Sequence, residues 1–322
     1  MAGTPTTGRG LYIDKALTGT IINRRPEGFI ADAFVPVVNV DKQTGIFWKF
    51  DHMEFRRHEE GISRRSPGAP ARKVNLSVGT DTYVAQNYAL GAEWYIEDEV
   101  NADDILQWRE TNGMLLMDRL MMDYEMRVAQ IATNTSNVGT VTTVASAWSD
   151  PDNSSPFDDI NNKLEAFRQR TGVRANTMII PQTVVKDLRR NAQLRSILFG
   201  DGGGLVTADR MAQLFDEIDQ VLIPYALVNT AGEQETVNGS GTLSDVWGND
   251  SIWLMHKNSL SGRNVDSWIT AFRWTSPLFT TPFAARTLPF DAKHMKTEMD
   301  VHYYQSEKIV SADLGERVLI TV

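Results

Sequence analysis

The longest regular hydrophobic pattern in the chain lies between Glu93 and Asn134. Asn101, Asp103 and Asp104 are suited to cap a helix and to place acids in its first turn. Apolar residues then recur at steps of three and four, which puts them on one helix face: Met114, Met117, Met121, Tyr124, Val128 and Ile131. The pattern predicts a helix over about 103–132, roughly 45 Å long at ~1.5 Å per residue. Such a length is typical of a scaffold rather than of a compact enzyme.

Two other stretches alternate apolar and polar residues with the period of a β-strand. One runs from Val74 to Tyr83, and together with the aromatic run 45–50 it predicts a long β-hairpin over residues 41–92. The other runs from His294 to Tyr303 and predicts a long, half-buried strand, followed by a final strand over 317–322.

The region between these elements mixes helices and strands. It lacks the regular strand–helix alternation and the phosphate loop of a doubly wound nucleotide-binding domain, so the predicted fold class is α+β. Helices are expected over 157–169, after Pro181 and over 208–215, and strands over 138–144, 177–180, 221–228, 251–255 and 268–274. Residues 275–289 are interrupted by prolines and are expected to form a connection.

Residues 1–40 form a separate N-terminal segment. It is rich in Gly and Pro. Up to Pro26 it is basic, because it contains one acidic residue and four basic ones: Arg9, Lys15, Arg24 and Arg25. It is either a frayed end or an arm that becomes ordered on a neighbouring subunit. The apolar residues between Phe29 and Val40 favour docking, because they are costly to leave in water.

The predicted hairpin has a polar, charged tip over residues 56–73. Loops of this length are usually functional or disordered, and the first interpretation is a mobile surface loop. A second interpretation is a finger that reaches onto an adjacent subunit, where its arginines pair with acidic surface: Arg56, Arg57, Arg64 and Arg65. Nucleic-acid binding is a third interpretation, although Glu59 and Glu60 interrupt the basic run.

Composition excludes several classes of protein. The formal net charge of −9 argues against a surface that binds nucleic acid throughout. The absence of cysteine excludes disulfides, Cys-ligated zinc and thiol catalysis. No stretch is apolar over the ~18 residues that a membrane helix needs, and the first residues lack a signal-peptide core. We therefore expect a soluble, intracellular product.

The sequence predicts no catalytic residue, no cofactor-binding residue and no metal ligand. The five histidines lack the HExxH motif and helical ligand spacing, and His294 and His302 are expected on a solvated strand face. The glycines of 200–204 lack the ending of a P-loop. The acidic stretch 150–159 lacks the glycine and glutamate of a calcium loop and is expected to form an Asx turn.

The order of these elements resembles that of tailed-bacteriophage major capsid proteins with the HK97-like fold. The similarity is strongest before and within the predicted helix, at Tyr95-Ile-Glu-Asp-Glu99, Asn101-Ala102 and Asp123–Ala129. Three later segments are similar to recurrent segments of that family: Ala147-Trp-Ser-Asp150, Asn176-Thr-Met-Ile-Ile180 and Val246-Trp-Gly248.

The resemblance implies a division of the chain into parts. Residues 1–40 would be the N-terminal arm and 41–92 the E-loop, an extended β-hairpin. Residues 93–150 and 285–322 would form the P-domain, with its spine helix and long strands, and 151–284 a mixed α/β A-domain. Arg24, Arg25 and the tip arginines would then contact other subunits.

The resemblance also implies a function. The chain would self-assemble into hexamers and pentamers of an icosahedral phage head that encloses double-stranded DNA, without enzymatic activity or cofactors. A scaffolding protein, a portal and decoration proteins would be partners, DNA would be contacted non-specifically, and the shell would form in the host cytoplasm and become the virion capsid. Two alternatives remain open: an encapsulin-like nanocompartment shell, and a soluble enzyme whose site the sequence does not reveal.

Overall fold

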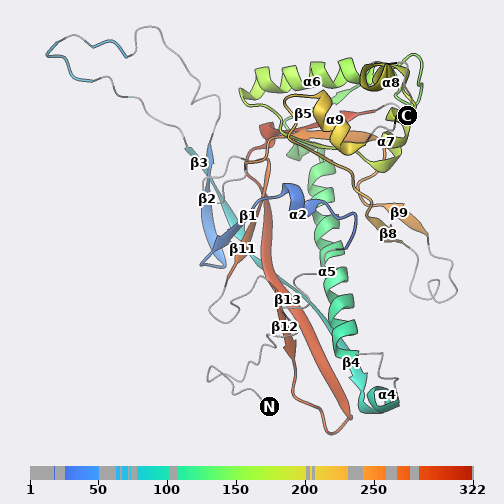
Figure 1. Cartoon of the computed structure of the whole chain (residues 1–322). Coiled ribbons are helices and arrows are strands. Elements are labelled where there is room, and N and C mark those ends of the chain that lie inside the picture. Colours follow the sequence, from blue (N-terminus) through green and yellow to red (C-terminus); the bar gives the residue numbers. More distant parts are fainter. Residues whose placement is uncertain are drawn as a thin grey trace.

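A long helix and a long sheet lie side by side and extend from a mixed α/β lobe (Figure 1). This computed structural model describes residues 18, 26–50, 63–65, 67–71, 73, 78–101, 108–200, 204, 207–230, 242–258, 267–275 and 283–320. A finger projects from one side of the molecule and a small hairpin from the other (Figure 1).

The predicted long helix is present as α5 (Trp108–Thr133). Residues 102–107, where the prediction placed its first turn, lie outside the described residues, and the short helix α4 (Ile96–Asn101) precedes them. Met117, Met121 and Val128 of the predicted apolar face are buried. Because the helix is amphipathic, this apolar face packs on the sheet while the other side carries charged residues.

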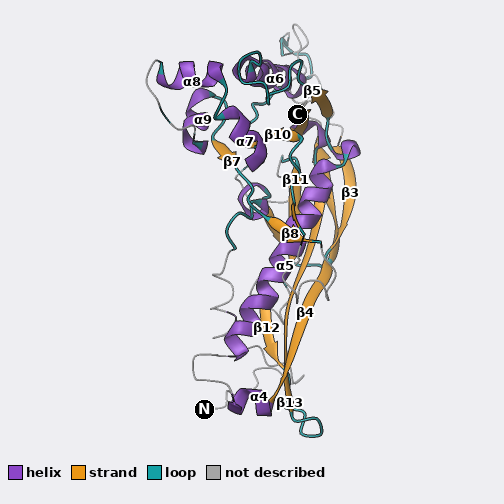
Figure 2. Cartoon of the chain, turned by 90° about the vertical axis from the view of Figure 1, so that its right-hand side faces the viewer, coloured by secondary structure: helices purple, strands orange, loops and turns teal. Residues whose placement is uncertain are grey.

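Strand β13 (Lys296–Ile309) organises the first sheet, in which five strands are described. One edge of β13 pairs along its length with β4 (Gln86–Tyr95). The other edge is shared by β11 (Ile269–Trp274) and β12 (Ala284–Thr287), and β1 (Val37–Val40) adds to β11 in parallel. Figure 2 shows α5 running along this sheet.

Two details of this sheet differ from the sequence predictions. Residues 284–287 form strand β12 within the stretch that was expected to be a connection, because pairing with β13 outweighs the prolines on either side. The predicted hairpin 41–92 also divides. Its β2 (Thr44–Phe50) and β3 (Val78–Val84) pair with each other, whereas residues 86–95 leave the hairpin and join β13.

The lobe contains a second sheet of five described strands, in the order β5-β14-β10-β6-β7. These strands are β5 (Thr140–Thr143), β14 (Gly315–Leu319), β10 (Ser251–Met255), β6 (Thr177–Ile179) and β7 (Gln220–Leu222). The helices of the lobe are α6 (Pro156–Thr171), α7 (Gln182–Leu188), α8 (Ala192–Phe199) and α9 (Ala208–Leu214). Sequence periodicity missed α8, whose first turn is capped by the Asn191 side chain.

The C-terminal end of α5 is built into the lobe. The last carbonyls of a helix lack partners within the helix. Here the Trp253 indole donates to Ala132 at 3.1 Å, and the Arg317 guanidinium donates to the Thr133 carbonyl at 2.8 Å. Because both donors come from the second sheet, the helix and the lobe are joined by satisfied hydrogen bonds as well as by packing.

Part of the N-terminal segment docks on its own chain. The helical turn α2 (Ala31–Phe34) packs on α5, and Ile30, Phe34 and Val35 are buried in the main core. The expectation that the apolar residues of this segment dock is thus correct, but residues 26–40 lie on the same subunit. Arg24 and Arg25 lie outside the described residues.

Candidate assembly surfaces

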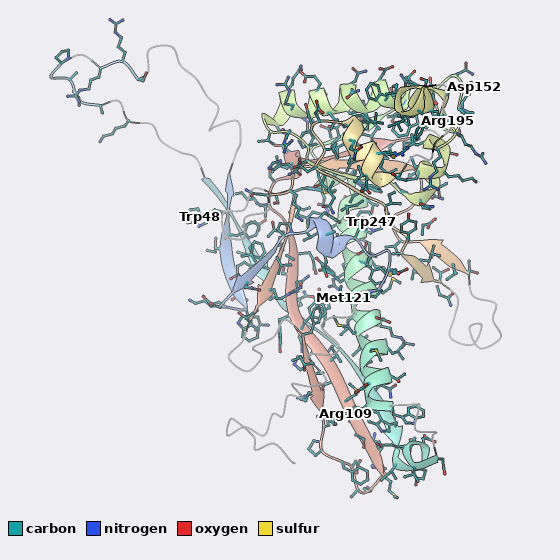
Figure 3. All side chains as sticks on the ribbon, in the orientation of Figure 1. Trp48, Arg109, Met121, Asp152, Arg195 and Trp247 are labelled. Carbon is teal, nitrogen blue, oxygen red and sulfur yellow. The ribbon has the colours of Figure 1, made fainter. Side chains whose placement is uncertain are left out.

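The finger formed by β2 and β3 has one face bound to the chain and one face exposed. On the bound face, the rings of Phe47 and Tyr83 lie 4.9 Å and 4.8 Å from that of Phe272 in β11. On the opposite face, Ile46, Trp48 and Val84 are 61%, 49% and 49% exposed. Figure 3 shows Trp48 projecting from the finger. A ribbon with apolar residues on both faces needs a second covering surface.

The tip of the finger carries the predicted arginines. Arg64 and Arg65 are exposed at its far end, whereas Arg56 and Arg57 lie outside the described residues. The segment 42–73 contains eight Lys and Arg against four Asp and Glu, so the finger is basic in an acidic protein. The structure holds a single chain, and the contact of these arginines with another subunit therefore stays a prediction.

A second protrusion lies on the opposite side of the molecule (Figure 1). Strands β8 (Leu227–Asn229) and β9 (Leu243–Asp245) pair as a hairpin, and Leu227 and Leu243 on the same face are 46% and 62% exposed. The segment 225–250 has four carboxylates and no Lys or Arg. This acidic, apolar hairpin complements the basic finger in charge, and sequence periodicity alone did not single it out.

A third exposed apolar group lies at the end of the molecule away from the lobe. Tyr95, Val100, Phe290 and Met295 are exposed there. Met295 has a positive φ of 50°, which is unusual for a residue other than glycine. Its carbonyl accepts a hydrogen bond from Ile96, so the strained turn is held against β4.

The hollow next to this end does not have the chemistry of an active site. It measures about 330 Å³ and is lined by the carboxylates of Glu93, Glu298 and Asp300. Lys296 pairs with Glu93 and Glu298, and these hydrogen bonds raise the lysine pKa. Burial acts to raise the pKa of Asp300, but His302 and Arg286 lower it overall. These carboxylates are therefore held as ion pairs rather than as proton-transfer groups.

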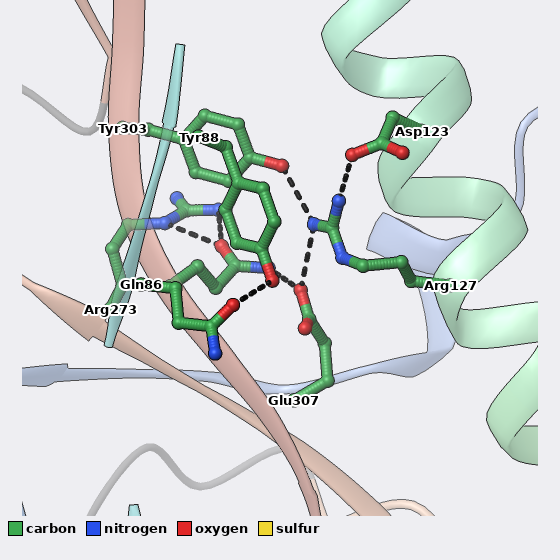
Figure 4. Close-up of polar contacts among 8 residues, drawn as sticks. Gln86, Tyr88, Asp123, Arg127, Arg273, Tyr303 and Glu307 are labelled. Carbon is green, nitrogen blue, oxygen red and sulfur yellow. Dashed lines mark hydrogen bonds and ion pairs between the residues drawn. The ribbon is translucent and has the colours of Figure 1, made fainter. Parts of the chain in front are cut away.

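An arginine network fixes α5 to the first sheet (Figure 4). The Arg127 guanidinium lies 3.7 Å from the centre of the Tyr88 ring and donates to the Tyr303 hydroxyl at 2.8 Å and to Glu307 at 3.1 Å. It also pairs with Asp123 on its own helix. Burial acts to lower the pKa of Arg127, but Tyr303 and Glu307 raise it overall, so the charge is retained.

The structure corrects one prediction about the histidines. His294 is exposed beside Asp291, as expected, but His302 is buried, at a residue where β13 is paired on both edges. The predicted Asx turn is present, since Asp150 accepts from the amides of residues 152 and 153. Among the described residues, His, Asp and Glu side chains form no group that could hold a metal ion.

The comparisons with known proteins agree with this architecture. No protein-family model matches the sequence. The chain is 25% identical over 245 residues to a major capsid protein of Burkholderia phage BcepMu, covering 73% of this chain and 74% of that protein. It is 24% identical over 274 residues to a major capsid protein of Pseudomonas phage JBD67, covering 81% and 83%.

Solved structures decide the fold. A phage-related protein from Bordetella bronchiseptica superimposes with a TM-score of 0.71 at 17% identity, over 96% of this chain and 97% of that one. The capsid of cyanophage P-SCSP1u gives 0.58 at 12% identity, over 99% and 95%. The chain has the HK97-like capsid fold.

The resemblance predicted from the order of elements is confirmed, and α5 occupies the place of the spine helix. A virus-like particle protein from Pyrococcus furiosus shares the fold with a TM-score of 0.52 at 11% identity, over 94% of this chain and 96% of that one. Among the described helices, none is both long and apolar enough to cross a membrane.

Proposed function

We propose that this chain is a phage major capsid protein that self-assembles into the hexamers and pentamers of an icosahedral head around double-stranded DNA. The observation that carries the proposal is the finger, whose Ile46, Trp48 and Val84 face has no covering partner among the described residues of the chain. The relatives named major capsid proteins support the same conclusion.

The finger of one copy would lie on the hairpin side of the next copy. The two surfaces lie on opposite sides of the elongated subunit, and such head-to-tail contacts generate rings. The exposed apolar face of the finger would meet Leu227 and Leu243, while Arg64 and Arg65 would pair with the carboxylates of the hairpin segment.

The remaining parts would act as the resemblance implies. Residues 1–40 would be the N-terminal arm, 41–92 the E-loop, 93–150 with 285–322 the P-domain, and 151–284 the A-domain. Arg24, Arg25, Arg56 and Arg57 would add contacts between subunits. A separate scaffolding protein, a portal and decoration proteins would assist assembly in the host cytoplasm, and the mature shell would form the virion capsid.

Electron microscopy of the purified chain tests the proposal directly. We expect closed particles, or free hexamers and pentamers. A monodisperse small species with catalytic turnover would instead support a soluble enzyme. Particles isolated from expressing cells with protein cargo and no DNA-packaging activity would support a nanocompartment shell.

A paired set of surface variants tests the finger. Replacing Ile46 and Trp48 with serine should prevent particle formation and leave the circular dichroism spectrum of the subunit unchanged, because both side chains are exposed. Ile197→Ser on α8, where the side chain is 45% exposed, is the matched control and should assemble normally. Normal particles from the finger variant would exclude this contact.

A further inference from the structure

Residues 26–40 form a strap that touches the spine helix, the first sheet and the lobe. At one end, β1 pairs with β11 of the first sheet. In the middle, α2 lies on α5. At the other end, the Gly28 carbonyl accepts a hydrogen bond from the Tyr225 amide at 3.1 Å, beside the β8–β9 hairpin. Contacts at both ends place the strap across the junction between the spine and the lobe.

A single buried carboxylate contacts the strap and the lobe together. Glu125 of α5 is 1% exposed. Its oxygens accept from the amide of Ala31 at 2.8 Å and from that of Ile30 at 3.1 and 3.2 Å. The indole of Trp247, in the turn between β9 and β10, donates to Glu125 at 2.6 Å. Figure 3 shows Trp247 next to the spine helix and α2.

Two further contacts tie the same groups together. The Trp247 ring packs edge-on against Phe34 of the strap, with ring centres 5.6 Å apart. Lys257, which follows β10, donates its ammonium group to the Ala33 carbonyl. Glu125 of α5 therefore holds the amides at the start of α2, and Lys257 of the lobe holds a carbonyl near its end.

We propose that Glu125 is a positioning residue that couples the docking of the strap to the position of the Trp247 turn, so that the two are held or released together. A buried carboxylate is stable only while its hydrogen bonds are satisfied. If either the strap amides or the Trp247 indole stops donating, burial of the carboxylate becomes less favourable, and its bonds to the remaining donor weaken as well. Burial raises the pKa of Glu125, and the hydrogen bonds from Trp247, Ala31 and Ile30 act in the opposite direction.

The sequence offers a matched pair of tryptophans for the test. Trp247 and Trp253 are both buried, their rings lie 5.4 Å apart, and both donate to α5, but Trp253 donates to the Ala132 carbonyl instead of Glu125. Hydrogen exchange of the Ile30 and Ala31 amides in the unassembled chain is the readout. Trp247→Phe should speed their exchange about tenfold, which corresponds to a lost bond to a charged group. Trp253→Phe should leave it unchanged.

Coupling must also act in the reverse direction. Gly28 has φ +87°, and a Cβ there would lie 2.7 Å from the Cβ of Tyr225, so Gly28→Ala should strain the far end of the strap. We expect faster exchange of the Trp247 indole proton and no change at Trp253. Equal effects at the two tryptophans, or equal amide exchange in the two Phe variants, would overturn the proposal.

Glu125→Gln provides a second route if Trp247→Phe does not fold. In glutamine an NH2 group, which only donates, replaces one carboxylate oxygen, so either the Ala31 amide or the Trp247 indole loses its acceptor, and the Ile30 amide loses one of its two. Exchange should then rise both at the Ile30 and Ala31 amides and at the Trp247 indole, because the two are released together. A rise at only one of the two places, or at neither, in a folded Gln variant would also overturn the proposal.

Discussion

At the scale of single residues, buried charges connect elements that lie far apart in the sequence. Arg127 is 180 positions from Glu307, and Glu125 is 122 positions from Trp247. Each charge lies among several donors or acceptors, which is the condition under which a buried charge is tolerated. The sequence shows both residues among the charged positions of an amphipathic helix, but it does not show their partners.

Arg127→Lys tests whether the shape of the guanidinium matters as well as its charge. Lysine cannot stack on Tyr88 and donate to both Tyr303 and Glu307 in the same geometry. We expect a loss of about 2 kcal/mol in the free energy of unfolding, measured by urea denaturation. Arg168→Lys, in an exposed pair with Glu165, should leave the midpoint unchanged. Equal midpoints for the two variants would contradict this role for Arg127.

At the scale of elements, the finger is a ribbon attached at its base. Among its described residues, Phe47 and Tyr83 pack on Phe272 in a cluster that also contains Val38, Val40 and Val310. In the far part of the finger, the described residues from 63 to 73 are mostly exposed. The base therefore belongs to the fold of the subunit, and the described part of the tip contributes little apolar burial to it.

Deleting residues 56–72 tests this division. The thermal midpoint of the subunit should change little, because the deletion spares Phe47, Tyr83 and Phe272. Assembly should be weakened or lost, as measured by sedimentation velocity. Phe272→Ala is the contrasting variant and should cost about 3–5 kcal/mol, since it opens a cavity under the base. A tip deletion that unfolds the subunit would mean that the tip is part of a core.

At the scale of the whole molecule, charge is divided between two sides. The chain has a net charge of −9, yet the finger segment is basic and the hairpin segment has no positive side chain. Like-charged subunits repel each other unless such opposite patches meet. The elongated shape places the patches on opposite sides, which suits repeated head-to-tail contacts (Figure 1).

A charge exchange tests this arrangement. Replacing Arg64 and Arg65 with glutamate should slow assembly, followed by light scattering at low salt. Adding Asp245→Lys on the hairpin should restore part of the rate, because the opposite charges would meet again. Asp245→Lys alone should also slow assembly. A triple variant as slow as the double variant would exclude pairing between these two surfaces.

The sequence by itself determined the parts of this protein that depend on local periodicity. The helix face of Met117, Met121 and Val128 and the alternation in β13 could be predicted because residues close in the sequence determine them. The order of these elements was sufficient to predict the HK97-like fold.

Tertiary structure decided the rest, because it depends on contacts between distant residues. Pairing with β13 makes a strand of residues 284–287 and separates β4 from the predicted hairpin. His302 of β13 is buried, although its neighbours in the sequence predict an exposed face. The strap is hydrogen-bonded to Glu125, which also accepts from Trp247, and no local sequence pattern predicts either contact. A hydrogen bond or a strand pair between residues a hundred positions apart leaves no periodic signal in the sequence, because the local pattern around each residue is the same whether or not that contact forms.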